Sequence, residues 1–468
     1  MHDPSDVRAL ALRTLMPGFD GAAVPAWLDD ALREGLGAVC LYGANVVDRD
    51  QLRSLCADLH ARSPRVVVAL DEEGGDVTRL HYRTGSPYPG NGVLGRLDDV
   101  GLTAAAAAAI GRDLRDVGVD LDLGPVVDVN SAPDNPVIGT RSFGADAGLV
   151  SRHAAAWVQG LRSTGTAACA KHFPGHGDTA TDSHLDLPVL AVDAATLRER
   201  ELAPFRAAVG AGAEAVMTAA LVVPSVDPGV PATFSAPLVQ GVLRGELGFT
   251  GTVVTDALDM AGASAATGIP EAAVRALAAG CDLLCLGPGT GARLLEEVLD
   301  AVVAAVAAGR IPAERLREAA AAVDRLADRE RHAAGRDGAL PAVPVVDAFE
   351  VGEHARTWLA GGGAVAIVQV STSSNLAVGQ VPWGPEAVGA ADDEAGAATA
   401  PRVAVVARDL GPDHPAWQVA ARHRARGASV VVVECGWPRG GADLVTWGGS
   451  PAVAGPLVAL LRGTGAAS

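Results

Sequence analysis

Short β-like runs alternate with helix-like stretches between residues 13 and 287, and this alternation constrains the fold most. The stretches between the runs are amphipathic or rich in alanine, as in DRDQLRSLCADLHARS. Strands that alternate with helices favour a parallel sheet covered by helices, and eight such repeats predict an α/β fold, a (β/α)8 barrel of the TIM type. A doubly wound sheet fits the spacing less well, and no G-x-G-x-x-G fingerprint opens a helix after a strand. The eight runs are residues 13–19, 37–43, 66–75, 122–129, 166–175, 213–220, 251–260 and 281–287.

A second, smaller α/β unit is expected after the barrel. The stretch GALPAVPV carries two prolines and has the composition of a linker. The later runs AVAIVQV, RVAVVAR, ASVVVVECG and ADLVTWGG are typical of short parallel strands. The predicted organisation is a TIM-barrel domain at residues 1–335, a linker at residues 336–363 and an α/β (αβα) sandwich domain at residues 364–468.

Composition narrows the partners and the compartment. The net charge of −18 argues against nucleic acid and anionic membranes, because both partners need basic patches. The six cysteines are scattered and lie mostly in apolar runs, which is typical of reduced, buried thiols. We see neither a signal peptide nor an apolar run long enough to span a membrane, and therefore expect a cytoplasmic protein. Because hydrophobic residues make up 49% of the chain and aromatics only 4%, its cores should consist of Ala, Val and Leu.

Titratable side chains directly follow four of the predicted strands. Asp71 follows VVVAL, Asp128 follows GPVV, Lys171 and His172 follow TAACA, and Asp256 follows GTVVT. Barrel enzymes place their active sites at the carboxyl ends of the strands, where these residues would meet. Lys171 is also the only lysine in the chain. The pattern predicts one active site built from several strands.

The stretch KHFPGHGDTATDSHLDLP, residues 171–188, concentrates histidines and aspartates in one segment. Pro174 and two glycines exclude a regular helix there, so most of it should be a loop over the barrel mouth. Asp182 and His184 are two residues apart, and an extended backbone puts both side chains on one side. An aspartate beside a histidine suits general acid/base chemistry near neutral pH. A solvated loop whose Asp and His cap turns is the alternative interpretation of this pair.

A metal-dependent hydrolase is a second interpretation of the same stretch. Histidines four apart bind zinc when they share a helix face, but Pro174 and Gly175 interrupt any helix here. No glutamate is placed as the base of such a site. We therefore expect no metal and no cofactor. The ligands of the rejected site would have been His172, His176, Asp182 and His184.

Two more loops offer groups for an oxygen-rich ligand. Arg79 lies in DEEGGDVTRL and Arg141 in DNPVIGTRSFG, although each arginine alone could equally form a surface salt bridge. Asp71 could accept hydrogen bonds from two sugar hydroxyls. Asp256 could attack the anomeric carbon of a sugar and form a glycosyl-enzyme intermediate, whereas Asp259 suits the first turn of a helix.

The segments KHFPGHGDTATDSH, DEEGGDVTRL, NPVIGTRSFG and VVTDALDM together resemble the signature segments of glycoside hydrolase family 3, in its β-N-acetylglucosaminidase (NagZ-type) branch. The resemblance spans residues 16–287 in the same order. It implies retaining hydrolysis of terminal β-linked N-acetylglucosamine through a covalent intermediate, with muropeptides or chitooligosaccharides as sources of substrate. It also implies that Asp256 is the nucleophile and that His184, paired with Asp182, is the general acid/base. The implied sugar-binding residues are Asp71, Arg79, Arg141, Lys171, His172 and, as loop support or sugar contact, His176.

Two departures and two alternatives accompany this resemblance. Relatives often have a histidine where this chain has Ala220, and an arginine where it has Ala44. The same dyad would also serve a phosphorylase, because a histidine tolerates an incoming phosphate better than a carboxylate does. A non-catalytic glycan-binding relative is the other alternative, although the nucleophile and the dyad are both present.

Overall fold

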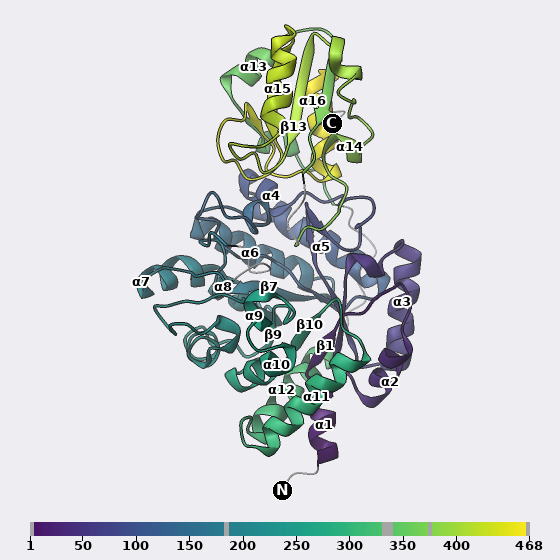
Figure 1. Cartoon of the computed structure of the whole chain (residues 1–468), viewed down its shortest axis with the longest axis vertical. Helices are drawn as coiled ribbons and strands as arrows, with labels where there is room; N and C mark the ends of the chain where they lie inside the picture. Colours follow the sequence, from purple (N-terminus) through teal and green to yellow (C-terminus); the bar gives the residue numbers. More distant parts are fainter. Residues whose placement is uncertain (1–3, 182–186, 330–339, 373–376, 465–468) are drawn as a thin grey trace.

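The computed structural model of the chain describes residues 4–181, 187–329, 340–372 and 377–464, which form two units (Figure 1). The larger unit contains the N-terminal three quarters of the sequence, and the smaller unit, coloured green to yellow, lies at one end beside α4 (Asn91–Leu97). The chain is therefore an α/β protein with a second α/β unit, as predicted.

Eight short parallel strands in the described residues form the TIM-like barrel of the first unit. Six of them are hydrogen-bonded in the order β2-β3-β6-β7-β8-β9, and β1 pairs with β10. A bridge between Val254 and Leu283 joins β9 to the segment entering β10. On the other side, the Gly37 amide donates to the Leu12 carbonyl, between the segments that enter β1 and β2. The strands are β1 (Leu15–Pro17), β2 (Ala38–Leu41), β3 (Val67–Leu70), β6 (Leu121–Asp122), β7 (Ala167–Phe173), β8 (Ala215–Thr218), β9 (Thr252–Thr255) and β10 (Leu284–Gly287).

Helices surround these strands, and short polar residues fix where several of them begin. Asp48, Asp99 and Asp146 accept hydrogen bonds from first-turn amides and thereby cap α3, α5 and α6. No helix in the described part of the chain is long and apolar enough to span a membrane. The main helices are α1 (Pro4–Arg13), α2 (Ala26–Glu34), α3 (Arg49–Arg62), α5 (Val100–Val117), α6 (Ala147–Arg162), α8 (Leu202–Gly210), η5 (Pro237–Glu246), α10 (Ile269–Ala279), α11 (Ala292–Ala307) and α12 (Ala313–Asp328).

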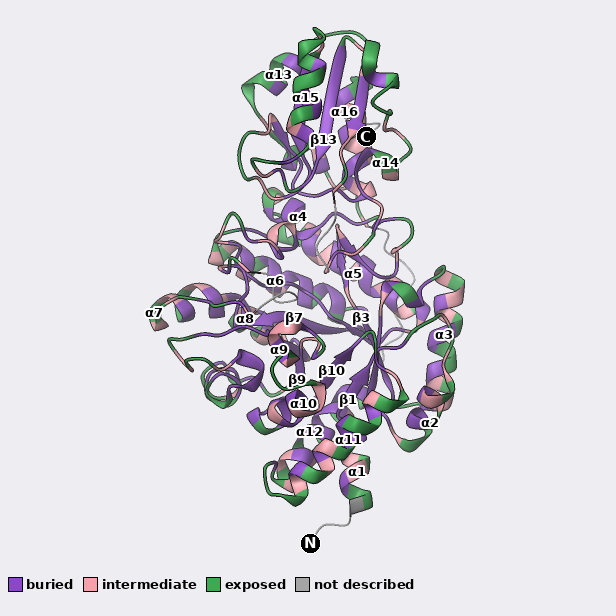
Figure 2. Cartoon of the chain, in the orientation of Figure 1, coloured by how far each residue is buried: buried purple, intermediate pink, exposed green. Residues whose placement is uncertain are grey.

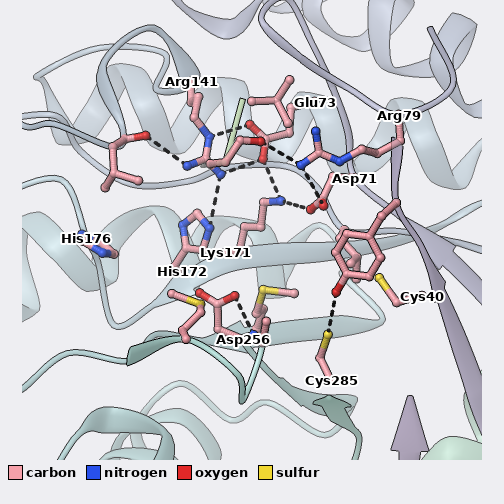
Figure 3. A pocket seen from close by; sticks show the side chains of 18 of the residues that line it. Cys40, Asp71, Glu73, Arg79, Arg141, Lys171, His172, His176, Asp256 and Cys285 are labelled. Carbon is pink, nitrogen blue, oxygen red and sulfur yellow. Dashed lines mark hydrogen bonds and ion pairs between the residues drawn. The ribbon is translucent and has the colours of Figure 1, made fainter. Parts of the chain in front are cut away.

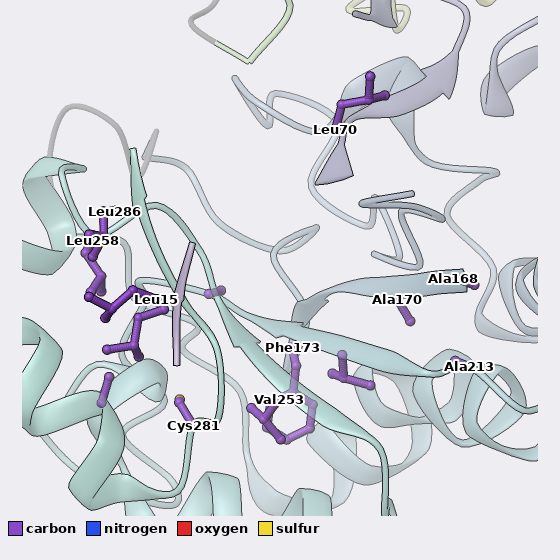
Figure 4. Close-up of a cluster of buried hydrophobic side chains, with 14 of the residues drawn as sticks. Leu15, Leu70, Ala168, Ala170, Phe173, Ala213, Val253, Leu258, Cys281 and Leu286 are labelled. Carbon is purple, nitrogen blue, oxygen red and sulfur yellow. The ribbon is translucent and has the colours of Figure 1, made fainter. Parts of the chain in front are cut away.

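The cores are built mainly from small and aliphatic side chains, as the composition predicts. Figure 2 shows the strands as buried and the outer helix faces as exposed. One cluster lies between the barrel and its helices and includes Leu15, Leu70, Phe173 and Val253 (Figure 4). A second cluster fills the barrel and includes alanines and methionines from neighbouring strands. All six cysteines are buried and unpaired, in agreement with the prediction.

The second unit is an αβα sandwich. Its five strands are ordered β11-β15-β14-β13-β12, and only β11 runs antiparallel to its neighbour. Helices α13 (Glu353–Leu359) and α16 (Pro451–Arg462) pack on one face of the sheet, and α15 (Ala416–Ala425) packs on the other. The strands are β11 (Glu350–Val351), β12 (Val365–Gln369), β13 (Arg402–Ala407), β14 (Ser429–Glu434) and β15 (Leu444–Val445).

The expected linker at residues 336–363 is longer than the connection in the described structure. Both β11 and α13 fall within that range, and β11 pairs with β15 of the second sheet. Pairing with a distant strand and burial of Trp358 make these residues part of the sandwich. We propose that the second domain begins near residue 345, where its first helical turn starts.

Candidate active site

The carboxyl ends of the barrel strands surround a cavity of about 340 Å³ (Figure 3). Asp71 follows β3 directly and Asp256 follows β9 directly. Lys171 and His172 are among the last residues of β7. The strand-end pattern in the sequence thus does bring these side chains together. Seven of the nine predicted site residues line the cavity: Asp71, Arg79, Arg141, Lys171, His172, His176 and Asp256.

The two remaining predicted residues, Asp182 and His184, lie outside the described residues. Their proposed acid/base role therefore rests on the sequence alone.

Lys171 is buried among carboxylates on one side of the cavity. Its ammonium nitrogen lies 2.6 Å from Asp71 Oδ1 and 2.7 Å from Glu73 Oε1. Burial alone would lower the pKa of Lys171, but the two carboxylates outweigh it and raise the pKa. Burial alone would raise the pKa of Asp71, but Lys171 and Arg79 hold it below its usual value. The cluster is consequently charged at neutral pH.

Arg141 completes this cluster through a paired contact with Glu73. Its Nε and Nη2 atoms donate to the two Glu73 oxygens at 2.9 and 2.8 Å, and Nη1 donates to the Val137 carbonyl at 3.1 Å. Such a planar fork fixes the guanidinium more firmly than a single contact would. Glu73 was not among the predicted site residues. A signal existed, since Glu73 is two residues after Asp71 in the same motif and the spacing suits a shared side.

His172 is held in one tautomer. Its Nδ1 atom lies 2.7 Å from Asp128 Oδ2, and a carboxylate can only accept, so Nδ1 carries the hydrogen. Arg141 Nη2 lies 3.4 Å from Nε2, which suits a donor facing the lone pair of a neutral ring. Asp128 also accepts from the backbone amides of His172 and His176, at 3.2 and 2.8 Å. The strand-end position of Asp128 was recognised in the sequence, but its supporting role depends on these contacts.

His176 is fixed in the same way by a hydroxyl. Thr179 Oγ1 donates to the His176 carbonyl at 3.0 Å and therefore accepts from His176 Nδ1 at 2.8 Å. Burial lowers the pKa of His176 to about 4. The ring is thus neutral at pH 7, with the lone pair on Nε2.

Asp256 lies across the cavity from Arg79 and Arg141 (Figure 3). One of its oxygens accepts from the Ala257 amide at 2.8 Å, and its side chain is half-buried. A carboxylate at a strand end, fixed through one oxygen and open to the cavity, can act as a nucleophile.

No metal cluster is evident within the described ranges, where no group of three or more His, Cys, Asp or Glu side chains could hold an ion. Two of the histidines considered as ligands already engage Nδ1, one with Asp128 and the other with Thr179.

A family model described as the glycosyl hydrolase family 3 N terminal domain matches residues 22–326. The chain belongs to glycoside hydrolase family 3. Family members named beta-hexosaminidase resemble it: the protein of Stenotrophomonas maltophilia (strain K279a) is 36% identical over 295 residues, and that of Nitrosospira multiformis is 38% identical over 299. These matches cover 62% of this chain and 86% and 85% of the two relatives.

Two solved structures of family 3 members also resemble this chain. A beta-N-acetylglucosaminidase from Paenibacillus sp. str. FPU-7 has a TM-score of 0.84 at 28% identity, and the match covers 97% of this chain and 96% of that one. NagZ from Neisseria gonorrhoeae, solved with N-trifluoroacetyl-D-glucosamine, has a TM-score of 0.54 at 30% identity. That match covers 67% of this chain and 98% of the Neisseria chain. The two-unit arrangement is therefore shared with the Paenibacillus protein over nearly its whole length.

Proposed function

We propose that this family 3 protein is a retaining β-N-acetylglucosaminidase that removes terminal β-linked N-acetylglucosamine from glycosides such as chitooligosaccharides or muropeptides. The observation that carries the proposal is the cavity itself, where a strand-end carboxylate faces a buried, charged cluster of hydrogen-bonding groups. The names of the relatives support the choice of sugar.

Asp256 is the nucleophile of this mechanism. Its open oxygen attacks the anomeric carbon, the bond to the aglycone breaks, and a covalent glycosyl-aspartate forms. Water then attacks the same carbon and releases the sugar with its original anomeric configuration. The charged cluster opposite Asp256 binds the sugar hydroxyls and fixes the ring relative to the carboxylate. The residues with this binding role are Asp71, Arg79, Arg141, Lys171, His172 and His176.

The proton transfers are assigned to the Asp182–His184 dyad. His184 protonates the leaving oxygen in the first step and takes a proton from water in the second, while Asp182 orients its ring. A histidine avoids the like-charge repulsion that a second carboxylate beside Asp256 would meet.

The deciding assay measures 4-nitrophenol release from its β-N-acetylglucosaminide and from its β-glucoside. We expect turnover of the N-acetyl sugar only, unaffected by a chelator. Adding inorganic phosphate distinguishes water from phosphate as the acceptor of the sugar. A phosphorylase would be accelerated by phosphate and would form the sugar 1-phosphate. Phosphate-dependent turnover would replace the hydrolase by a phosphorylase, and a folded protein inactive on both sugars would contradict the proposed function.

A further inference from the structure

Among the described residues that line the cavity, Ala377 comes from the second unit. The match to the glycosyl hydrolase family 3 N terminal domain ends at residue 326, so Ala377 lies outside the matched part of the chain. Arg79 Nη2 donates to the Ala377 carbonyl at 2.8 Å, although the two residues are 298 positions apart in the sequence. The side chain of Arg79 is only 10% exposed, so a hydrogen bond to the half-buried Ala377 carbonyl strongly affects where the guanidinium lies.

Ala377 also contacts the loop that carries Arg141. Its methyl group packs against the cluster formed by Val126, Val137 and Ile138, and the last two of these line the cavity. One residue of the second unit therefore touches both loops that supply the arginines of the site.

The segment following Ala377 is anchored to the barrel. The Gln380 amide donates to Tyr82 Oη at 3.2 Å. Gly379 has a φ of 69°, and a Cβ atom there would lie 3.0 Å from the same hydroxyl, so this close approach suits glycine. Further on, Trp383 is covered by Arg408 at 4.6 Å, and the Gly384 amide donates to the Gly449 carbonyl at 2.6 Å. The segment is held at the barrel side and at the sandwich side.

The position of this wall relative to Asp256 determines which hydroxyl of a bound sugar lies beside Ala377. In Figure 3 Asp71 and Arg79 lie on the opposite side of the cavity from Asp256. In a pyranose ring, C4 lies opposite the anomeric carbon. A sugar whose anomeric carbon is at Asp256 thus directs its 4-hydroxyl toward Asp71 and Arg79, beside Ala377.

We propose that Ala377 is a specificity-determining residue of the sugar site: its carbonyl positions Arg79 for the hydroxyl farthest from the reacting carbon, and its methyl group closes the cavity there. This inference rests on the proposed function. In a β-1,4-linked chain, the next sugar would be attached at that same hydroxyl, so a wall at this place restricts the site to terminal residues.

The test compares Ala377→Leu and Ala377→Gly with the wild-type chain on the 4-nitrophenyl glycosides of N-acetylglucosamine and of its 4-deoxy analogue. Leucine intrudes on the wall and displaces the segment, and we expect a rise in KM of about 10-fold with kcat nearly unchanged, because the lost contact is remote from the reacting carbon. Glycine removes the methyl contact with Val137 and Ile138 and loosens the carbonyl, and we expect a rise of about 3-fold. The 4-deoxy substrate lacks the 4-hydroxyl, so on this substrate the KM of Ala377→Gly should equal that of the wild-type chain.

Ala398→Leu is the matched control, since Ala398 is an exposed alanine of the same unit outside the cavity lining. Its KM should equal that of the wild type on both substrates. The glycine variant keeps the test valid if the leucine variant fails to fold. An unchanged KM in folded Ala377→Gly, or an equal rise on both substrates, overturns the inference while leaving the hydrolase intact. A wild-type chain inactive on both glycosides overturns the proposed function and this inference together.

Discussion

At the scale of single residues, the site is defined by which groups are charged and which are neutral. Lys171 and Arg141 remain cationic because Glu73 contacts both of them within 3 Å. His172 and His176 each engage Nδ1 with an acceptor, which fixes the orientation of both rings, and burial keeps the pKa of His176 low. The cavity thus offers fixed donors from the cations and fixed acceptors from the carboxylates, as a ligand rich in hydroxyl groups requires.

Asp256→Ala is expected to abolish turnover, with kcat/KM reduced by about 10⁴-fold or more, because no other group supplies the covalent step. Azide should restore part of the activity of this variant and give the α-glycosyl azide, since a small anion can enter the space left by the carboxylate. The product is identified by NMR. Asp259→Ala, a carboxylate deletion three residues away, is the control and should retain measurable turnover without azide. If Asp256→Ala hydrolyses normally, another group is the nucleophile.

His184→Ala should slow substrates with poor leaving groups far more than activated aryl glycosides, because a proton matters most when the leaving oxygen is basic. The measurement compares kcat for 4-nitrophenyl and for alkyl N-acetylglucosaminides. Equal losses on both substrates would argue against His184 as the acid.

His176 predicts a pH dependence of stability. Its folded pKa of about 4 lies below the usual value of 6.5, so between these values the unfolded chain binds a proton that the folded chain does not. The neutral His176 ring therefore contributes to the free energy of unfolding above pH 6.5. This contribution, up to about 3 kcal/mol, is lost as the pH falls to 4. Urea unfolding at several pH values gives the free energy of unfolding at each pH. Between pH 6.5 and pH 4 this free energy should fall less steeply in His176→Gln than in the wild-type protein. Parallel curves for the two proteins would contradict the low pKa.

At the scale of elements, the loop after β6 supports the loop after β7 through Asn135. Its amide nitrogen donates to the carbonyls of His176 and Thr179 at 2.9 and 3.0 Å. Its oxygen accepts from the amides of Val137 and Ile138 at 2.9 and 2.8 Å. One buried side chain therefore joins the loop that carries Arg141 to the loop that carries His176.

Asn135→Ala should destabilise the fold by about 3 kcal/mol, because it leaves buried backbone groups without their partners. Binding should also weaken, since two cavity loops lose their connection, and KM should rise more than kcat falls. Asn130→Ala is the comparison, because the oxygen of this equally buried asparagine accepts from a single amide, that of Gly139 at 3.1 Å. Urea unfolding and steady-state kinetics measure both effects. Equal stability losses in the two variants would refute the bridging role of Asn135.

At the scale of the whole molecule, the second unit is packed against the loops that form the site. The Gly449 amide and Thr140 Oγ1 donate to the two oxygens of Asp76, at 3.2 and 3.1 Å. Trp447 belongs to the same apolar cluster as Val93 of α4, and Arg96 lies 5.1 Å from its ring centre. The two units therefore share one apolar junction beside the cavity.

Trp447→Ala should cost about 3–5 kcal/mol of stability, as loss of a buried aromatic does. Because the junction holds the second unit over the cavity, we also expect KM to rise. Trp417→Ala is the matched control. Trp417 belongs to α15 of the same unit and packs against the apolar cluster on the α15 face of the sheet, a different cluster from that of Trp447. It should lower stability without changing KM. An unchanged KM in folded Trp447→Ala would show that the junction does not affect the site.

The sequence alone determined the alternation of strands and helices and the place of polar residues after the strands, because both depend on local patterns of apolar residues. It therefore predicted the barrel, the sandwich and Asp71, Lys171, His172 and Asp256 as neighbours. Only the tertiary structure decided that Glu73 joins Lys171 to Arg141, that Asp128 orients His172, and that Ala377 reaches the cavity. These contacts join residues between 44 and 298 positions apart, and they depend on how the loops and the second unit pack. Local spacing could mark Glu73 as a further site residue beside Asp71, but it carries no information about which distant residues pair. The pairings themselves could therefore not be predicted from the sequence.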